Sequence, residues 1–109
     1  MGTIKSELFS KKQVEVAAMA KAIGHPARIA ILQYLAKTNA CINGDLVEEL
    51  GLAQATISQH LKELKAVGLI RGTIEGTSVC YCIDPEVWNR YSEVFKSFFT
   101  RKIENTTCC

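Results

Sequence analysis

The fold is decided by residues 51–70, which read GLAQATISQHLKELKAVGLI. The spacing of the apolar residues predicts a helix over 54–66, because they recur at helical intervals and form one stripe. That inward stripe comprises Ile57, Leu61 and Leu64. Gly51 precedes the helix where the chain must reverse sharply, and Gly68 ends it, since glycine is favoured just past a helix C-terminus. A short preceding helix and this turn predict a helix-turn-helix.

The opposite face of this helix carries polar side chains of short and medium length. We assign to that exposed face Gln54, Thr56, Ser58, Gln59, His60 and Lys62. Such groups suit base edges and phosphates in the major groove of DNA. The alternative interpretation is an ordinary solvated helix face.

The surrounding pattern completes the fold prediction: mainly α with a small β-hairpin (α+β), in the order of a winged helix-turn-helix. We expect helices over 7–23, 26–37, 44–50, 54–66 and 85–104, an extended segment at 41–43 and a hairpin within 69–83. The hairpin is the wing. Further candidate DNA contacts near it are Lys65, Arg71, Thr73 and Thr77. We expect residues 1–104 to form one domain and 105–109 to form a flexible tail that contains cysteine.

Length and composition agree with one soluble domain. The chain has 109 residues, 48% hydrophobic and 22% charged, with a net charge of +2. No apolar run approaches a membrane span and no signal peptide is visible, so we expect a cytoplasmic protein without membrane contact. No nucleophile–base set, glycine-rich phosphate loop or carboxylate pair is present, so we do not expect an enzyme.

Several segments resemble the ArsR/SmtB family of winged helix-turn-helix repressors. They are HPARIAIL (25–32), Asp45-Leu46, ATISQHLK (55–62), AVGLI (66–70) and VCYCID (79–84). The resemblance covers about residues 15–90, and it implies operator binding and release of DNA when an effector binds. It also implies a homodimer through the first and last helices. One departure is the presence of Ala53 and Ala55, where the family often has small hydroxyl residues that cap the recognition helix; Gln54 or backbone contacts would substitute.

The aromatic side chains of the last helix support the same dimer independently. That stripe comprises Trp88, Tyr91, Phe95, Phe98 and Phe99. A second copy of this helix and of the alanine-rich first helix would cover the stripe. Two recognition helices would then lie about 34 Å apart and read a palindromic operator in double-stranded DNA. The alternative is that the stripe packs only within one chain.

The five cysteines predict thiols that are reduced at rest. The resemblance does not identify the effector, since the family's arsenite sensors often carry a close cysteine pair where this chain has only Cys41. The family's zinc sensors use histidine on the last helix, and 85–104 contain none. Strand alternation directs Val79, Tyr81 and Ile83 to the core, and Cys80 and Cys82 outward. This last wing strand is expected to pair with 41–43.

The candidate ligand set of an effector site is therefore Cys41, Cys80 and Cys82, with Cys108 and Cys109 added from the tail. Thiolates suit arsenite, cadmium or copper(I) as effector, and no cofactor is required for folding. The same cysteines could instead serve a redox or persulfide sensor, or have no function. A winged-helix protein-interaction module that does not bind DNA also remains open. We interpret His25 as a helix N-cap or an interhelix contact.

Overall fold

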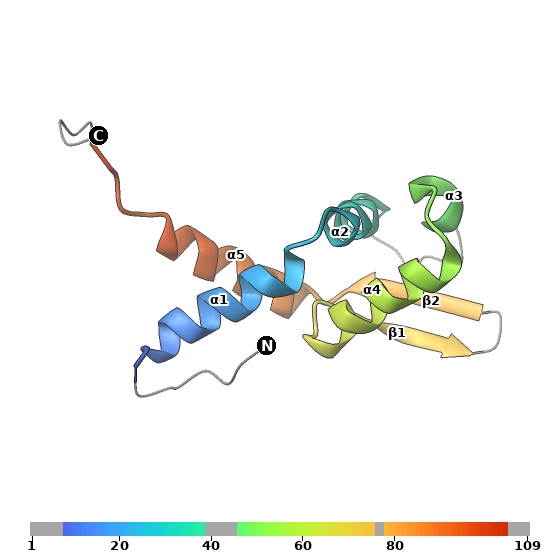
Figure 1. Ribbon diagram of the computed structural model, residues 1–109, viewed down its shortest axis with the longest axis horizontal. Coiled ribbons are helices and arrows are strands. Elements are labelled where there is room, and N and C mark those ends of the chain that lie inside the picture. The colour runs from blue at the N-terminus through green and yellow to red at the C-terminus, as the bar shows by residue number, and fades with distance from the viewer. Residues whose placement is uncertain (1–7, 39–45, 76–77, 105–109) are drawn as a thin grey trace.

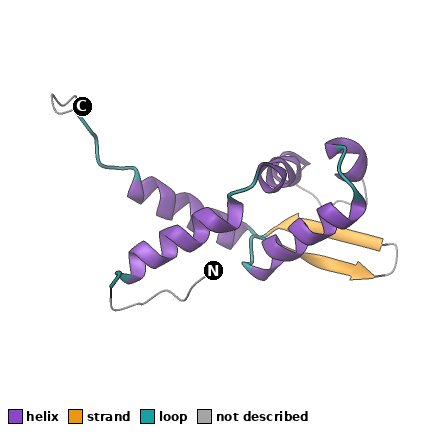
Figure 2. Ribbon diagram, viewed as in Figure 1, coloured by secondary structure: helices purple, strands orange, loops and turns teal. Residues whose placement is uncertain are grey.

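The computed structural model describes residues 8–38, 46–75 and 78–104 (Figure 1). Its elements are α1 (Lys11–Ile23), α2 (Pro26–Thr38), α3 (Leu46–Leu50), α4 (Gln54–Ala66), β1 (Ile70–Glu75), β2 (Ser78–Ile83) and α5 (Pro85–Phe98). The strands form an antiparallel two-stranded sheet. Helices with one hairpin confirm the predicted fold class, and Figure 2 shows how little of the described chain is strand.

The molecule is elongated, with extents of 55 × 32 × 26 Å. In Figure 1, α1 and α5 lie side by side at one end, and α2, α3, α4 and the hairpin form the other end. A hydrophobic core joins the two ends, and its most deeply buried members are Ile31, Leu35, Ile57, Leu61, Leu64, Leu69 and Ile70. The predicted inward stripe of α4 is therefore confirmed. Among the described residues, no helix is both long and apolar enough to cross a bilayer.

The end of α4 is fixed by a backbone motif that also begins the wing. Gly68 has a φ of +83° and its N–H donates to the carbonyl of Lys65, while the N–H of Leu69 donates to the carbonyl of Leu64. These two bonds form a Schellman motif, in which glycine takes the left-handed conformation. Leu64 and Leu69 are both buried beside it. The chain therefore leaves α4 in a fixed direction and enters β1 at Ile70.

Two helix boundaries differ from the sequence prediction. The first helix begins at Lys11 and not at residue 7, because Ser10 and Gln13 form a capping box at its N-terminus. The last helix ends at Phe98 and not at residue 104. There the Thr100 hydroxyl donates to the carbonyl of Lys96, and such side-chain bonds compete with helix continuation.

The wing contains a second glycine that the fold requires. Gly72 has a φ of +145° and lies opposite Tyr81 in the sheet. A Cβ at this position would come within 1.9 Å of the Cys80 carbonyl oxygen, so any side chain would force the two strands apart. The wing strands approach each other closely only because this residue is glycine.

Replacing Gly68 with alanine is expected to lower the free energy of unfolding by about 1–2 kcal/mol. A Cβ there would meet only Val87, at an ordinary 3.5 Å, so the cost comes from the left-handed backbone and not from crowding. Gly68→Asn is the matched control and should cost less, because asparagine tolerates this conformation. Urea unfolding measures both variants; equal losses would contradict the backbone explanation.

Candidate nucleic-acid interface

The turn between α3 and α4 has the geometry that a helix-turn-helix needs. Gly51 has a φ of +67°, in the left-handed region, as its predicted role in a sharp reversal requires. Its N–H donates to the carbonyl of Val47 at 2.9 Å and closes the last turn of α3. Helix α4 then packs on α2, α3 and β1, which leaves its other face outward.

The outward face of α4 is polar. Gln54, Thr56, Gln59 and Lys62 are exposed, in agreement with the sequence assignment, whereas Ser58 is half-buried. The side-chain amide of Gln54 donates to the Ser58 hydroxyl, and that of Gln59 donates to the Glu63 carboxylate, both at 3.2 Å. These bonds lie in solvent, where their net contribution is small, so the amides can exchange them for base edges.

No side chain caps the N-terminus of α4. The N-cap residue, Ala53, has extended backbone angles and no side-chain acceptor. Gln54, which the sequence offered as a substitute, bonds to Ser58 instead. The first backbone N–H groups of α4 therefore have no side-chain acceptor, and a helix N-terminus in this state attracts anions such as phosphate.

The assignment of His60 to the exposed face is wrong. Its exposed fraction is 9%, and its Nδ1 accepts a hydrogen bond from Arg28 Nε at 3.1 Å. The reason is its position on the helix: His60 lies three residues after Ile57 and four before Leu64, so it is a neighbour of both, and both point into the core. Burial lowers the pKa of His60, with further lowering by the nearby charges of His25 and Arg28.

His25 serves both roles that the sequence suggested. Its Nδ1 accepts from the N–H of Ala27 and so caps α2. Its ring also lies 4.4 Å, between centroids, from the ring of His60. His25 therefore links the α1–α2 connection to α4.

The remaining candidate DNA contacts lie near the wing. Lys65 and Arg71 are exposed, at the end of α4 and in β1 respectively. Thr73 lies in β1 opposite Cys80, and Thr77 lies outside the described residues. With Lys62, Lys65 and Arg71 make three exposed cations on α4 and β1, beside the exposed Glu63.

Two of the five candidate thiol ligands can be placed. Cys80 and Cys82 are free, half-buried and on β2, where alternation puts them on the face opposite the buried Tyr81. They pair across the sheet with Thr73 and Arg71. Tyr81 and the partly buried Ile83 pack with the core, as predicted. No group of three metal-binding side chains occurs among the described residues.

The other three cysteines fall outside the described ranges: Cys41, Cys108 and Cys109. The predicted pairing of 41–43 with the last wing strand, and the shared face of three thiols, are therefore not tested. The same holds for the tail 105–109.

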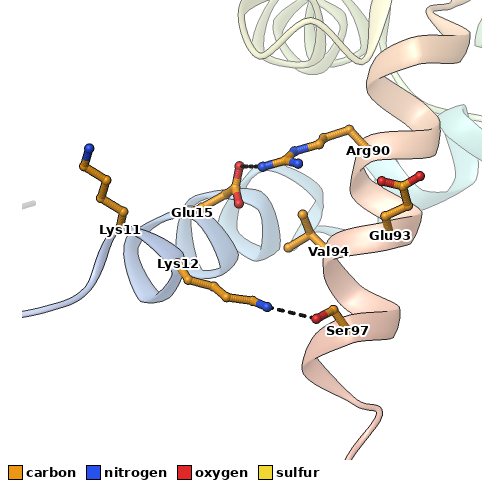
Figure 3. Close-up of a pocket in the computed structure, with 7 residues that line it drawn as sticks. All are labelled: Lys11, Lys12, Glu15, Arg90, Glu93, Val94 and Ser97. Carbon is orange, nitrogen blue, oxygen red and sulfur yellow. Dashed lines mark hydrogen bonds and ion pairs between the residues drawn. The ribbon is translucent and has the colours of Figure 1, made fainter.

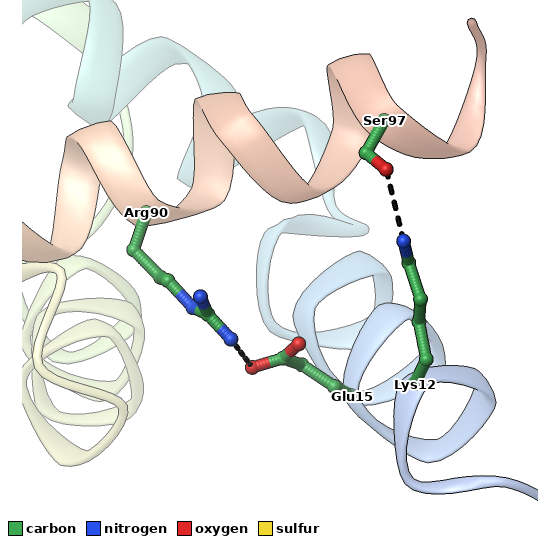
Figure 4. A network of polar contacts seen from close by, with 4 residues as sticks. All are labelled: Lys12, Glu15, Arg90 and Ser97. Atoms are coloured by element: carbon green, nitrogen blue, oxygen red, sulfur yellow. Dashed lines mark hydrogen bonds and ion pairs between the residues drawn. The ribbon is translucent and has the colours of Figure 1, made fainter.

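One side of the α1–α5 pair is polar. An open pocket of about 530 Å³ lies there, and Figure 3 shows the residues that line it: Lys11, Lys12, Glu15, Arg90, Glu93, Val94 and Ser97. Two contacts join the helices across it: Arg90 pairs with Glu15 at 2.7 Å, and Lys12 Nζ donates to the Ser97 hydroxyl at 2.9 Å (Figure 4). The carboxylate of Glu15 raises the pKa of Arg90. These exposed contacts set the register of the two helices more than their stability.

Another side of the pair is apolar. A groove of about 540 Å³ is lined by Ser10, Lys12, Gln13, Val16, Ala17, Ala20, Phe95, Phe98 and Phe99. Phe95 is shared with a smaller pocket that Trp88, Ile23, Ile29 and Leu32 also line. Phe98 and Phe99 are 57% and 73% exposed. The single chain therefore leaves much of the aromatic stripe of α5 uncovered, although Tyr91 is buried within it.

Comparison with known proteins identifies the family. Residues 25–71 match the model of the bacterial regulatory proteins of the arsR family. The chain is 36% identical over 86 residues to the uncharacterized HTH-type transcriptional regulator MJ1325 of Methanocaldococcus jannaschii. The matched segment covers 79% of this chain and 93% of that protein. It is 41% identical over 61 residues to the HTH-type transcriptional repressor SmtB of Mycobacterium tuberculosis. That match covers 56% of this chain and 44% of the repressor.

A solved structure described as a possible transcriptional regulator for arsenical resistance superposes with a TM-score of 0.65 at 26% identity. The match covers 74% of this chain and 83% of that structure. These relatives are transcriptional regulators and not enzymes, and their fold is the winged helix. The chain therefore belongs to the ArsR/SmtB family of winged-helix transcriptional repressors.

Proposed function

We propose that this chain is a homodimeric repressor that binds a palindromic operator through α4 and the wing, and that a thiol-binding effector releases it. The observation that carries the proposal is the exposed polar face of α4, held between a short supporting helix and a hairpin. In a member of this family, that surface is where double-stranded DNA is expected to bind.

The proposed DNA contacts separate into base-reading and phosphate-binding groups. Along α4 the base-reading groups are Gln54, Thr56, Ser58 and Gln59. The phosphate-binding groups are Lys62, Lys65, Arg71, Thr73 and Thr77. His60 is left out because it is buried. The uncapped N–H groups at the start of α4 add a phosphate site that no side chain blocks.

The dimer is proposed from the apolar groove between α1 and α5. Its alanines allow the backbone of another helix to approach closely, and Phe98 and Phe99 leave large apolar surfaces in water. Burying one such aromatic side chain contributes about 1.5–3 kcal/mol. A second copy related by a two-fold axis would bring the same groove and the same aromatic residues against the first. The polar contacts of Arg90 and Lys12 lie outside this groove or at its edge.

The effector site is proposed around Cys80 and Cys82. Two residues apart in an extended strand, their Cα atoms are separated by roughly 6.6 Å, at the upper limit for a disulfide. A soft ion that bridges two thiolates suits this spacing better than a direct disulfide does, and one solved structure of similar fold is described as a possible transcriptional regulator for arsenical resistance. Cys41, Cys108 and Cys109 are the proposed additional ligands. Arsenite or cadmium bound here must favour the DNA-free geometry.

DNA binding is tested by fluorescence anisotropy with a duplex that carries the promoter of the gene encoding this chain. We expect the logarithm of affinity to fall linearly with the logarithm of salt concentration, because phosphate binding releases counterions. Lys62→Ala should weaken binding. It should also reduce the magnitude of that slope by about 2, because a dimer would lose one phosphate contact in each copy.

Lys96→Ala is the matched control for Lys62→Ala, since Lys96 is an exposed lysine on α5. It should leave both affinity and slope unchanged. Affinity that is independent of salt, or unchanged in Lys62→Ala, would support a protein-interaction module instead.

The dimer is tested by sedimentation equilibrium. Phe98→Glu should raise the dimer dissociation constant at least roughly a hundredfold, because two aromatic side chains leave the groove and two carboxylates enter it. Lys11→Gln also lowers the charge by one unit but lies on the polar side of α1, so it should leave the constant unchanged. A wild-type chain that sediments as a monomer at micromolar concentration would contradict the dimer.

The effector is tested by titrating reduced protein with arsenite, cadmium and zinc while following thiolate–metal absorbance and release of DNA. We expect arsenite or cadmium to release DNA, and Cys80→Ser or Cys82→Ser to abolish the response. An unchanged response in both variants would contradict a site on β2. Release by peroxide or persulfide but not by the ions would indicate the redox or persulfide sensor instead.

A further inference from the structure

A polar cluster lies on the side of α4 that faces away from the proposed DNA surface. Arg28, in the first turn of α2, donates from Nε to His60 Nδ1 at 3.1 Å. It also donates from a terminal guanidinium nitrogen to the carbonyl of Ala22 at 2.9 Å. One side chain of α2 therefore contacts both α4 and the last turn of α1.

Each partner of Arg28 is held in place. Ala22 is buried, and its carbonyl belongs to the last turn of α1, where carbonyls lack intrahelical partners and attract cations. The ring of His60 is packed against His25, whose own Nδ1 is fixed by the Ala27 N–H. Arg28 therefore fixes the side chain of His60, and with it the middle of α4, relative to α1 and α2.

The hydrogen bond constrains the protonation state of His60. Nδ1 can accept from Arg28 only when it carries no proton, so His60 is the neutral tautomer with its hydrogen on Nε2. In a protonated ring Nδ1 would carry a hydrogen and could no longer accept from Arg28 Nε. The positive charge of the ring would also lie 3.1 Å from that of the guanidinium. The hydrogen bond between Arg28 and His60 thus exists in only one charge state of His60.

We propose that Arg28 and His60 are positioning residues for the DNA-binding helix, and that protonation of His60 breaks their contact and weakens DNA binding in mildly acidic solution. The proposal rests on the proposed function, because it needs α4 to be the helix that enters the groove. Neither residue touches DNA in this scheme. They act by holding α4 in the orientation that the operator fits.

The direction of the pH dependence follows from the surroundings of His60. Within the described ranges, the groups whose charge acts on it are His25 and Arg28, and burial is the larger cause of its lowered pKa. In the unfolded chain a histidine titrates near 6.5, so the unfolded chain binds the proton first as the pH falls. Stability is therefore complete above about pH 6.5 and declines as the pH drops through the window below it.

The direction for DNA affinity separates this proposal from ordinary electrostatics. Added positive charge on the protein normally strengthens binding to a polyanion, so a histidine that simply faces DNA gives tighter binding in acid. Loss of the Arg28 contact gives the opposite result. Affinity should fall as the pH decreases, by up to about tenfold per pH unit for each protomer.

The test measures operator-duplex affinity from pH 8 to pH 5 at constant salt. The wild type should weaken in acid, whereas His60→Asn should keep near wild-type affinity at pH 8 and lose the pH dependence. Asparagine offers an oxygen that can accept from Arg28 and does not titrate. His25→Asn is the matched control, because the chain has only two histidines; it retains an N-cap acceptor and should retain the pH dependence.

A second measurement does not depend on DNA, and its first part uses the wild-type chain alone. Nitrogen-detected NMR of the wild-type imidazoles should show His60 as the Nε2–H tautomer, titrating below 6.5. Arg28→Met should raise the pKa of His60, because it removes both the donor to Nδ1 and the nearby charge.

The outcomes are distinct. A duplex that is not bound at any pH contradicts the proposed function and leaves the NMR result standing. Tighter binding in acid, an Nδ1–H tautomer, or the same pH profile in His60→Asn as in the wild type overturns the positioning role of Arg28 and His60.

Discussion

The burial of one side of α4 is the constraint on which the rest of the structure depends. Ile57, Leu61 and Leu64 are at most 2% exposed, so the helix cannot rotate without taking them out of the core. Because this apolar face is held in the core, the polar face on the other side of α4 is exposed to solvent in one orientation. The left-handed Gly68 then ends the helix on the core side and directs the chain into the wing. Orientation of the recognition surface is thus a consequence of packing.

Helical periodicity predicted most of this arrangement, since the apolar residues of α4, the glycines at its two ends and Pro85 at the start of α5 are local signals. His60 shows where residue type misled the assignment. Its polarity suggested an exposed side chain, whereas its place three residues after Ile57 and four before Leu64 puts it beside the buried stripe. The start of α1 was also readable, because Ser10 and Gln13 have the spacing of a capping box.

Other features could not be read from the sequence, because they join residues far apart in the chain. Arg28 and His60 are 32 positions apart, and Glu15 and Arg90 are 75 apart. Any sequence offers an arginine many possible acceptors. Only the packing of α2 against α4 and of α1 against α5 brings Arg28 to His60 and Arg90 to Glu15. The end of α5 at Phe98 was missed for a different reason: no glycine or proline marks it, and the local bond from Thr100 to Lys96 leaves little signal in the sequence.

The two helices of the proposed dimer face, α1 and α5, are each connected by hydrogen bonds to the part of the molecule that contains α4 and the hairpin. Arg28 joins α4 to the last carbonyls of α1. At the other end, the N–H of Asp84 donates to the carbonyl of Leu69, and the Asp84 side chain caps α5. The hairpin and α4 therefore cannot shift freely relative to α1 and α5, because both connections are made by buried or capping groups. In the proposed dimer, a displacement of β2 by the proposed effector at Cys80 and Cys82 would reach α5 through Asp84, two residues after Cys82, and would so change the spacing of the two recognition helices.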